Sequence, residues 1–301
     1  MPEPIMAVTC AAFVVVHFLV TYKRYSRISR MCGDIDNIIN GDYHINLDNY
    51  KEGELSVLSD EIYKVLSRLK DTAELLEKDK KYLSDSMADI SHQLRTPLTS
   101  INILVSRLSE EDITNDRKMN LCIELRKKLT GIDNLIDVLL KMSKFDAGTI
   151  VFKNEEISVS NVINSAYDAV AVPMELKGQT FEYMADDCTI CGDEMWLTES
   201  FSYIFKNCME HTPENGKITV QVNDTALYTE IIIRDTGNGF EKEDIPHLFE
   251  RFYKGQNASK DSFGIGLSLS RMIIVEQNGT IKADNYKDGA RFTVRFYKQV
   301  V

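Results

Sequence analysis

Apolar residues recur every seven positions through residues 55–108. One series begins at Leu55 and keeps this spacing as far as Leu104, and a second runs from Met87 to Leu108. The two series correspond to the a and d positions of a heptad repeat, so the pattern predicts a long coiled-coil helix.

A second helix of the same character follows the short polar stretch 109–115. Its two apolar series consist of Cys122, Leu129 and Ile136 and of Leu125, Ile132 and Leu139. Two consecutive helices of this kind predict a helical hairpin. Two hairpins complete a four-helix bundle, so we expect an obligate homodimer.

The pattern changes in the C-terminal half. Residues 228–234 alternate between apolar and polar side chains and lead into the glycine turn 235–240, which predicts a strand and its turn. A second glycine cluster at 264–269 opens a helical run that extends to 277–279. Residues 201–208 carry a helical apolar pattern, so this half of the chain mixes helices with strands.

His92 occupies heptad position f in the long coil, the position farthest from the apolar seam. Thr96 lies one turn further on the same face. A lone histidine there is most simply a solvated surface residue, but Pro97 argues against that reading. Proline inside a helix costs ~3 kcal/mol and here frees the carbonyl of Gln93. A neutral imidazole beside such a defect is a candidate nucleophile.

The segment 90–98, with the sequence ISHQLRTPL, resembles the phosphoacceptor box of bacterial sensor histidine kinases. Four later segments resemble, in order, the N, G1, F and G2 boxes of the ATPase fold shared by histidine kinases, gyrases, heat-shock chaperones and mismatch-repair proteins. They are the helical segment ending at His211, the turn 235–240, the segment 247–254 and the cluster 264–269. The resemblance covers residues 76–301.

The resemblance implies an ATP-binding α/β sandwich with Mg²⁺ as a further cofactor. Asp235 would accept a hydrogen bond from the adenine amine, and Asn207 would ligate the metal, which prefers oxygen ligands and few protein groups. The glycines would bring backbone close to the nucleotide. The expected nucleotide-binding residues are Asn207, His211, Asp235, Gly237, Gly239, Gly264, Gly266 and Leu267.

The resemblance also implies the catalytic residues. His92 would accept the phosphoryl group, and Lys254, with Arg251 as a second candidate, would bring positive charge to the transferring group. Thr96 matches the position that orients water when such kinases dephosphorylate their partner. Residues 241–263 would form a mobile lid.

The chain departs from the family pattern at four positions. Gln93 replaces the carboxylate that usually follows the histidine, and an amide cannot remove a proton. Our hypothesis is that Gln93 fixes the imidazole tautomer. Tyr203 replaces a frequent asparagine, Glu210 replaces a basic residue near the phosphates, and Ser268 replaces the last glycine of the G2 box.

Residues 5–22 are almost wholly apolar and carry no charged residue apart from the titratable His17, which predicts one transmembrane helix. Four cations follow it, Lys23, Arg24, Arg27 and Arg30. The positive-inside rule then places the N-terminus outside and the rest in the cytoplasm. A cleaved signal peptide is the rival reading, but it requires cations before the apolar stretch.

These patterns divide the chain into five parts. We expect residues 1–4 to form an extracytoplasmic stub and residues 5–22 the membrane helix. A stub of four residues leaves no external sensor domain, so either the protein senses within or below the membrane or the sequence begins late. Residues 23–75 resemble a HAMP-type linker, punctuated by glycines at 41 and 53, that continues as a coiled coil. Residues 76–147 form the dimerisation and phosphotransfer domain, and residues 150–301 the ATP-binding domain.

The net charge and the cysteines limit the expected ligands and the redox state. The net charge of −11 and the pI of about 5.1 speak against direct nucleic-acid binding. Six cysteines are scattered, and the close pair Cys188 and Cys191 reads as part of a strand rather than as half of a metal site. We therefore expect reduced thiols.

The favoured interpretation is a homodimeric sensor histidine kinase in a bacterial membrane, anchored in the lipid by one helix. Its partner would be a cognate response regulator, itself a DNA-binding transcription factor, which it would also dephosphorylate. Gln93, Tyr203 and Glu210 leave two alternatives open. One is a phosphatase whose kinase activity has decayed, and the other is a non-enzymatic dimeric signalling scaffold.

Overall fold

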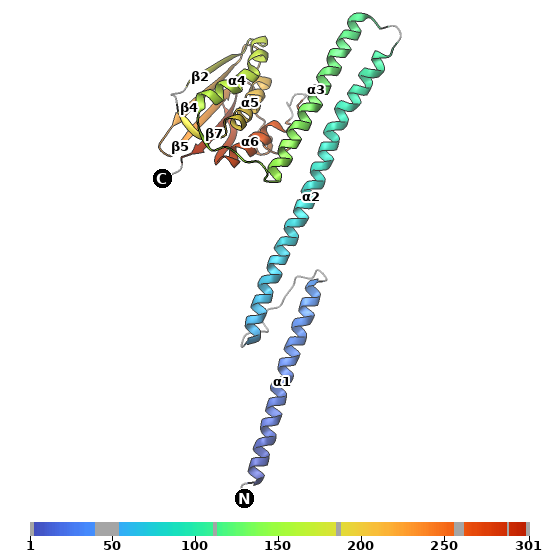
Figure 1. Ribbon diagram of the computed structural model, residues 1–301, viewed down its shortest axis with the longest axis vertical. Helices are drawn as coiled ribbons and strands as arrows, with labels where there is room; N and C mark the ends of the chain where they lie inside the picture. The colour runs from blue at the N-terminus through green and yellow to red at the C-terminus, as the bar shows by residue number, and fades with distance from the viewer. Residues whose placement is uncertain are drawn as a thin grey trace. The chain divides into compact units, whose positions relative to one another are not determined.

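The computed structural model describes residues 3–39, 54–110, 113–184, 188–255, 262–287 and 289–298 (Figure 1). Contacts divide the chain into two compact units, residues 1–88 and 89–301. The glycines at 41 and 53 that punctuate the HAMP-type linker, and residues 256–261 of the expected lid, lie outside the described residues.

The described residues of the first unit are helical. Helix α1 spans Glu3–Ile39, and the long helix α2 spans Glu54–Leu108 and continues into the second unit. The side chains of Phe13 and Phe18 on α1 are 75% and 70% exposed. Among the helices of the described residues, none combines the length and the apolar character needed to cross a membrane.

The second unit begins with the predicted helical hairpin, which is confirmed. Helix α2 remains helical through the buried Pro97, and helix α3 spans Asn115–Asp146. The hydroxyl of Thr114 caps α3 by accepting a hydrogen bond from the Arg117 N–H at 3.4 Å. Leu104 and Leu135 are buried.

The seam of the hairpin is only partly covered by its own chain. Large apolar side chains remain exposed along both helices: Met87, Leu98, Ile103, Met119, Leu129 and Ile136. Met87, Leu129 and Ile136 belong to the heptad series, and exposed apolar side chains at such positions are typical of a surface that another chain covers.

A five-stranded sheet forms the centre of the C-terminal domain, in the order β2-β4-β5-β7-β6. Its strands are β2 (Thr180–Met184), β4 (Lys217–Asp224), β5 (Tyr228–Asp235), β6 (Gly279–Tyr286) and β7 (Gly289–Tyr297). Strand β2 runs parallel to β4, and the other neighbours are antiparallel. Strands β1 (Glu155–Ser158) and β3 (Thr189–Gly192) form a separate antiparallel pair.

Three helices cover one face of this sheet, as Figure 1 shows: α4 (Val159–Leu176), α5 (Glu194–His211) and α6 (Gly266–Glu276). The apolar faces of the helices and the inward residues of β4, β5 and β7 form one core. Phe201, Phe205 and Phe292 are fully buried there. Strand β5 alternates strictly between half-buried and buried residues, as its sequence predicts. Phe249 and Phe252 also pack against this core.

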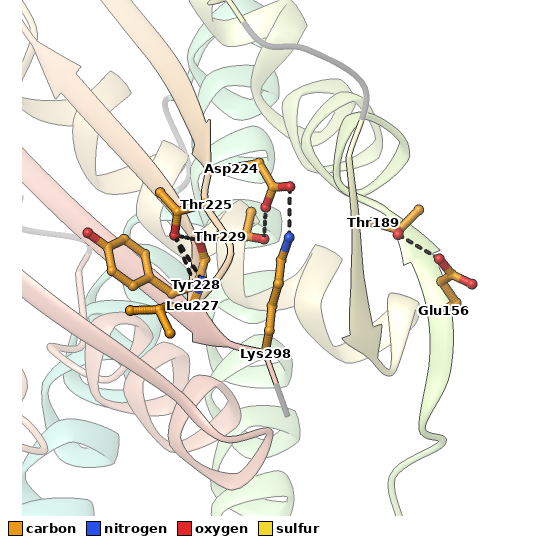
Figure 2. A network of polar contacts seen from close by, with 8 residues as sticks. All are labelled: Glu156, Thr189, Asp224, Thr225, Leu227, Tyr228, Thr229 and Lys298. Carbon is orange, nitrogen blue, oxygen red and sulfur yellow. Dashed lines mark hydrogen bonds and ion pairs between the residues drawn. The ribbon is translucent and has the colours of Figure 1, made fainter. Parts of the chain in front are cut away.

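A polar network closes the β4–β5 turn (Figure 2). Asp224 accepts hydrogen bonds from the hydroxyl of the fully buried Thr229 at 2.6 Å and from Lys298 Nζ at 2.8 Å. Lys298, followed by Thr229, holds the pKa of the Asp224 carboxyl below its usual value. The hydroxyl of Thr225 accepts a hydrogen bond from the Tyr228 N–H at 3.1 Å. The turn therefore fixes the far end of the strand that leads to Asp235.

Candidate active site

One cavity of about 1160 Å³ lies between the hairpin and the sandwich in the second unit. Its walls come from α2, α3, α5, the lid residues and the start of α6. The predicted site residues in its lining are Gln93, Thr96, Asn207, His211, Gly239, Lys254, Gly264, Gly266 and Leu267. Four others, His92, Asp235, Gly237 and Arg251, stand outside the lining.

His92 lies on the exposed side of α2, as its heptad position f predicts. His92 is exposed, whereas Gln93 is half-buried and faces the cavity. The hydroxyl of Thr96 donates to the His92 carbonyl at 3.3 Å. The imidazole is therefore accessible, and its neighbours Gln93 and Thr96 line the cavity.

The lid reaches this segment through Lys254. Its Nζ donates a hydrogen bond to Oε1 of Gln93 at 3.0 Å. Partial desolvation lowers the pKa of Lys254. A cation from the sandwich thus lies beside the residue that follows His92.

Asp235 lies at the end of β5 and is buried. Its Oδ1 accepts hydrogen bonds from the backbone N–H groups of Gly237 at 2.9 Å and Ala290 at 3.1 Å. Its Oδ2 has no hydrogen-bond partner among the described residues. The adjacent Cys208 thiol is only a weak donor. Burial removes water from the Asp235 carboxylate and raises its pKa. The acceptor oxygen Oδ2 is therefore both desolvated and available to a donor.

Three glycines leave no room for a side chain. A Cβ on Gly237 would lie 2.6 Å from the His211 carbonyl oxygen, and one on Gly264, which has a φ of +69°, would lie 2.4 Å from the Tyr253 carbonyl oxygen. A Cβ on Gly266 would lie 3.0 Å from the Tyr203 ring. In the described residues, α6 starts without a side-chain cap. Its first N–H groups are thus suited to an anion.

Three of the four departures from the family pattern, Gln93, Tyr203 and Glu210, also line the cavity, whereas Ser268 is buried in α6. The hydroxyl of Tyr203 donates to Oε1 of Glu199 at 3.1 Å. Burial, with Glu199 as the next cause, raises the pKa of Tyr203. Glu210 lies 4.0 Å from Lys206 Nζ, so a cation partly offsets its charge. Asn207 is half-buried on the same helix.

Arg251 contacts α3. Its guanidinium donates two hydrogen bonds to the Asp146 carboxylate, at 2.7 and 2.6 Å. A second ion pair joins α3 to the sandwich, from Lys141 to Glu199. Sequence analysis missed Asp146, Lys141 and Glu199, because their partners lie 105 and 58 residues away and no local motif marks them.

These features fit a nucleotide whose base carries an exocyclic amine. The unpaired Oδ2 of Asp235 suits an exocyclic amine, and the crowded glycines at 264 and 266 bring backbone N–H groups to the place where phosphates would lie. The amide of Asn207 is an oxygen donor of the kind that Mg²⁺ accepts beside phosphates.

Two family models match the chain. Residues 82–148 match the His Kinase A (phospho-acceptor) domain, and residues 192–300 match the histidine kinase-, DNA gyrase B- and HSP90-like ATPase. The phosphoacceptor box and the four ATPase boxes identified from the sequence fall within these two ranges.

Known proteins resemble the chain over most of its length. It is 29% identical over 294 residues to the sensor histidine kinase YclK of Bacillus subtilis, with 95% of this chain and 62% of that protein covered. It is 28% identical over 253 residues to the sensor protein VanS of Enterococcus faecium, with 81% and 66% covered. The chain thus spans less than two thirds of either relative.

A solved structure shares the fold. The histidine kinase ThkA, in complex with the response regulator protein TrrA, superposes with a TM-score of 0.62 at 20% identity, covering 79% of this chain and 67% of that one. This likeness concerns the fold. The two family models and the relatives lead to one conclusion about the family. The chain belongs to the sensor histidine kinases of two-component systems.

Proposed function

We propose that this protein is a histidine kinase that phosphorylates His92 from ATP and passes the phosphoryl group to an aspartate of a response regulator. The observation that carries the proposal is the shared cavity, in which Asn207, Gly264 and Gly266 face Gln93 and Thr96 of the phosphoacceptor segment. The residues expected to bind the nucleotide therefore line the same cavity as two close neighbours of His92.

ATP with Mg²⁺, when bound, supplies an electrophilic γ-phosphorus whose bond to the ADP oxygen is broken. Asp235 would hold the adenine, Asn207 the metal, and the backbone at Gly264 and Gly266 the phosphates. His92 attacks through one ring nitrogen, a nitrogen–phosphorus bond forms, and the other ring nitrogen gives up its proton.

Lys254 and Gln93 would organise this step. Lys254 places positive charge beside the phosphoacceptor segment, where it stabilises the transferring group. Gln93 cannot take the proton, so we propose that it fixes the imidazole tautomer and that water or the product phosphate accepts the proton.

The test is incubation of the full-length protein with γ-labelled ATP and Mg²⁺, beside His92→Gln and Asp235→Ala. We expect acid-labile, alkali-stable label on the wild type and on neither variant. Label that persists in His92→Gln would refute the phosphoacceptor assignment. No label on a wild type that still binds nucleotide would favour the phosphatase or the scaffold.

A homodimer and a response regulator are the proposed partners. The exposed heptad residues Met87, Leu129 and Ile136 support pairing with a second copy into a four-helix bundle. The complex of ThkA with TrrA supports a regulator as partner by analogy. Light scattering of the full-length protein, and transfer of label to a purified regulator, test the two parts separately.

A membrane anchor is also part of the proposal, with the N-terminus outside and the catalytic domains in the cytoplasm. It rests on the apolar composition of residues 5–22, the cations at 23–30 and the exposed Phe13 and Phe18. We expect the protein in the membrane fraction after carbonate washing. Val15→Asp should release it, and Val65→Asp, an equally drastic change on α2, should not.

A second candidate activity is dephosphorylation of the regulator. Thr96 lines the cavity one turn from His92, where its hydroxyl could orient a water molecule. With phosphorylated regulator and no ATP, Thr96→Ala should slow loss of the regulator's phosphate and leave labelling of His92 largely intact. Equal dephosphorylation rates would exclude this role.

A further inference from the structure

We propose that the C-terminal end of α3 carries a two-pair clamp that seats the ATPase domain in the arrangement where Lys254 meets Gln93. The clamp consists of Asp146 with Arg251 and of Lys141 with Glu199. Arg251 and Glu199 are thereby positioning residues for the transfer to His92. This inference rests on the proposed kinase function.

The first pair has the geometry of a strong contact. Two nitrogens of Arg251 donate to the two oxygens of Asp146, and the arginine side chain is only 21% exposed. A guanidinium that donates two parallel hydrogen bonds to one carboxylate stabilises the contact and also fixes the relative orientation of the two groups. One guanidinium nitrogen also lies 3.4 Å from the sulfur of Met272 on α6. The fork of Arg251 therefore faces α3, and Arg251 is absent from the cavity wall.

The second pair leads into the nucleotide pocket. Glu199 accepts hydrogen bonds from Lys141 and, at 3.1 Å, from the hydroxyl of Tyr203. Tyr203 lines the cavity, and its ring lies against Gly266 at the start of α6. Glu199 thus connects a lysine of the bundle helix to the residue that borders the phosphate-binding turn.

The two pairs have opposite polarity and different directions. Helix α3 supplies the cation of one pair and the anion of the other. Residues five apart on a helix differ by about 140° around its axis. Lys141 and Asp146 therefore lie on different sides of α3, and their partners Glu199 and Arg251 contact the helix from different directions. A rotation of α3 cannot preserve both contacts. The clamp therefore fixes the rotation of α3 relative to the ATPase domain.

Aromatic packing supports the same end of α3. The rings of Phe145 and Trp196 lie 5.4 Å apart and edge to face, and Phe152 lies 5.8 Å from Trp196. Lys141 Nζ lies 5.9 Å from the Trp196 ring centroid. Partial exclusion of water by these rings makes the adjacent ion pair stronger than a fully exposed one.

The test is an exchange of charges in the full-length protein, measured by labelling of His92 at saturating ATP. Asp146→Arg and Arg251→Asp should each slow labelling by about tenfold or more, since misplacement of reacting groups has effects of this size. The double variant D146R/R251D should recover a rate near that of the wild type. The KM for ATP should stay unchanged throughout.

The rescue distinguishes positioning from contact with phosphate. An arginine that touches the γ-phosphoryl group cannot be replaced by aspartate, so a double variant as slow as Arg251→Asp would overturn the clamp. A raised KM in Arg251→Asp would do the same. If the double variant no longer binds ADP, Asp146→Asn decides: it should slow labelling with ADP affinity unchanged, and a wild-type rate would overturn the clamp.

A matched control exists on the sheet. Arg291 and Asp284 form a similar two-bond pair, at 2.6 Å for both bonds, within β6 and β7. The exchange D284R/R291D should leave labelling unchanged. Failure of the wild type to label His92 would refute the proposed function itself, whereas labelling that ignores Asp146 and Arg251 would refute only the clamp.

Discussion

Lys254 and Gln93, 161 residues apart in sequence, are joined by a hydrogen bond of 3.0 Å. The bond links a cation of the ATPase domain to the residue after the phosphoacceptor of the same chain. It also gives the amide at position 93 a partner that a carboxylate would have bound as an ion pair. Gln93 therefore retains a positioning contact although it lacks the chemistry of a base.

Gln93→Ala tests this contact. The variant removes a hydrogen bond to a charged group, of a kind worth about 1.5–3 kcal/mol, so labelling of His92 should slow by roughly tenfold to a hundredfold. Rapid-quench measurement at saturating ATP gives the rate. Asn102→Ala, an exposed change on the same helix, serves as control. An unchanged rate in Gln93→Ala would dismiss the positioning role.

Gly264→Ala tests the crowded turn before α6. A side chain at positive φ costs about 1–2 kcal/mol, and here its Cβ would also lie 2.4 Å from the Tyr253 carbonyl oxygen. Gly148→Ala is the matched control, because Gly148 has a φ of +60° and open space around it. Thermal unfolding should show a larger loss for Gly264→Ala, accompanied by weaker ATP binding. Equal losses would show that the close approach is unimportant.

Asp235→Asn should reveal the cost of the buried charge. The pKa of Asp235 in the folded protein lies above the ordinary value of 3.8, so folding favours the protonated carboxyl. The resulting stabilisation is complete below pH 3.8 and is lost as pH rises through the folded-state pKa. The amide does not titrate. Without nucleotide, the Tm of the variant minus that of the wild type should therefore increase between pH ~4 and ~8. A Tm difference that decreases over this pH range would contradict a raised pKa for Asp235.

Asp224→Ala probes the network of Figure 2, where the pKa shift has the opposite sign. Loss of the partner of the buried Thr229 should lower the free energy of unfolding by about 1–3 kcal/mol. Because the folded pKa of Asp224 is lowered, its charged contribution is present above 3.8 and is lost as pH falls through the folded value. Asp224→Asn, which keeps an acceptor for Thr229, should cost less. Equal costs would assign the effect to charge alone.

Local sequence patterns anticipated the hairpin and the elements around the expected nucleotide site, but gave no prediction for α4 or for strands β1, β2, β4, β6 and β7. The heptads predicted the hairpin of α2 and α3, strict alternation predicted β5, and the glycine clusters predicted the turns before Gly237 and Gly266. Most of the predicted site residues line the one large cavity described. Arg251 was expected to bring positive charge to the transferring phosphoryl group, and this role stays a prediction. In the structure its guanidinium is bonded to Asp146.

What the sequence determined by itself is the chemistry that each segment carries: an exposed imidazole on a helix, a carboxylate at a strand end, and glycines where backbone must approach a ligand. Such features depend on neighbours a few residues apart, and periodicity records them. Only the tertiary structure decided which side chains pair across the hairpin and the sandwich. The contacts of Lys254 with Gln93, Arg251 with Asp146 and Glu199 with Lys141 join segments 161, 105 and 58 residues apart. Surface charges of this kind have many possible partners, and only the packing of α3 against the ATPase domain selects among them.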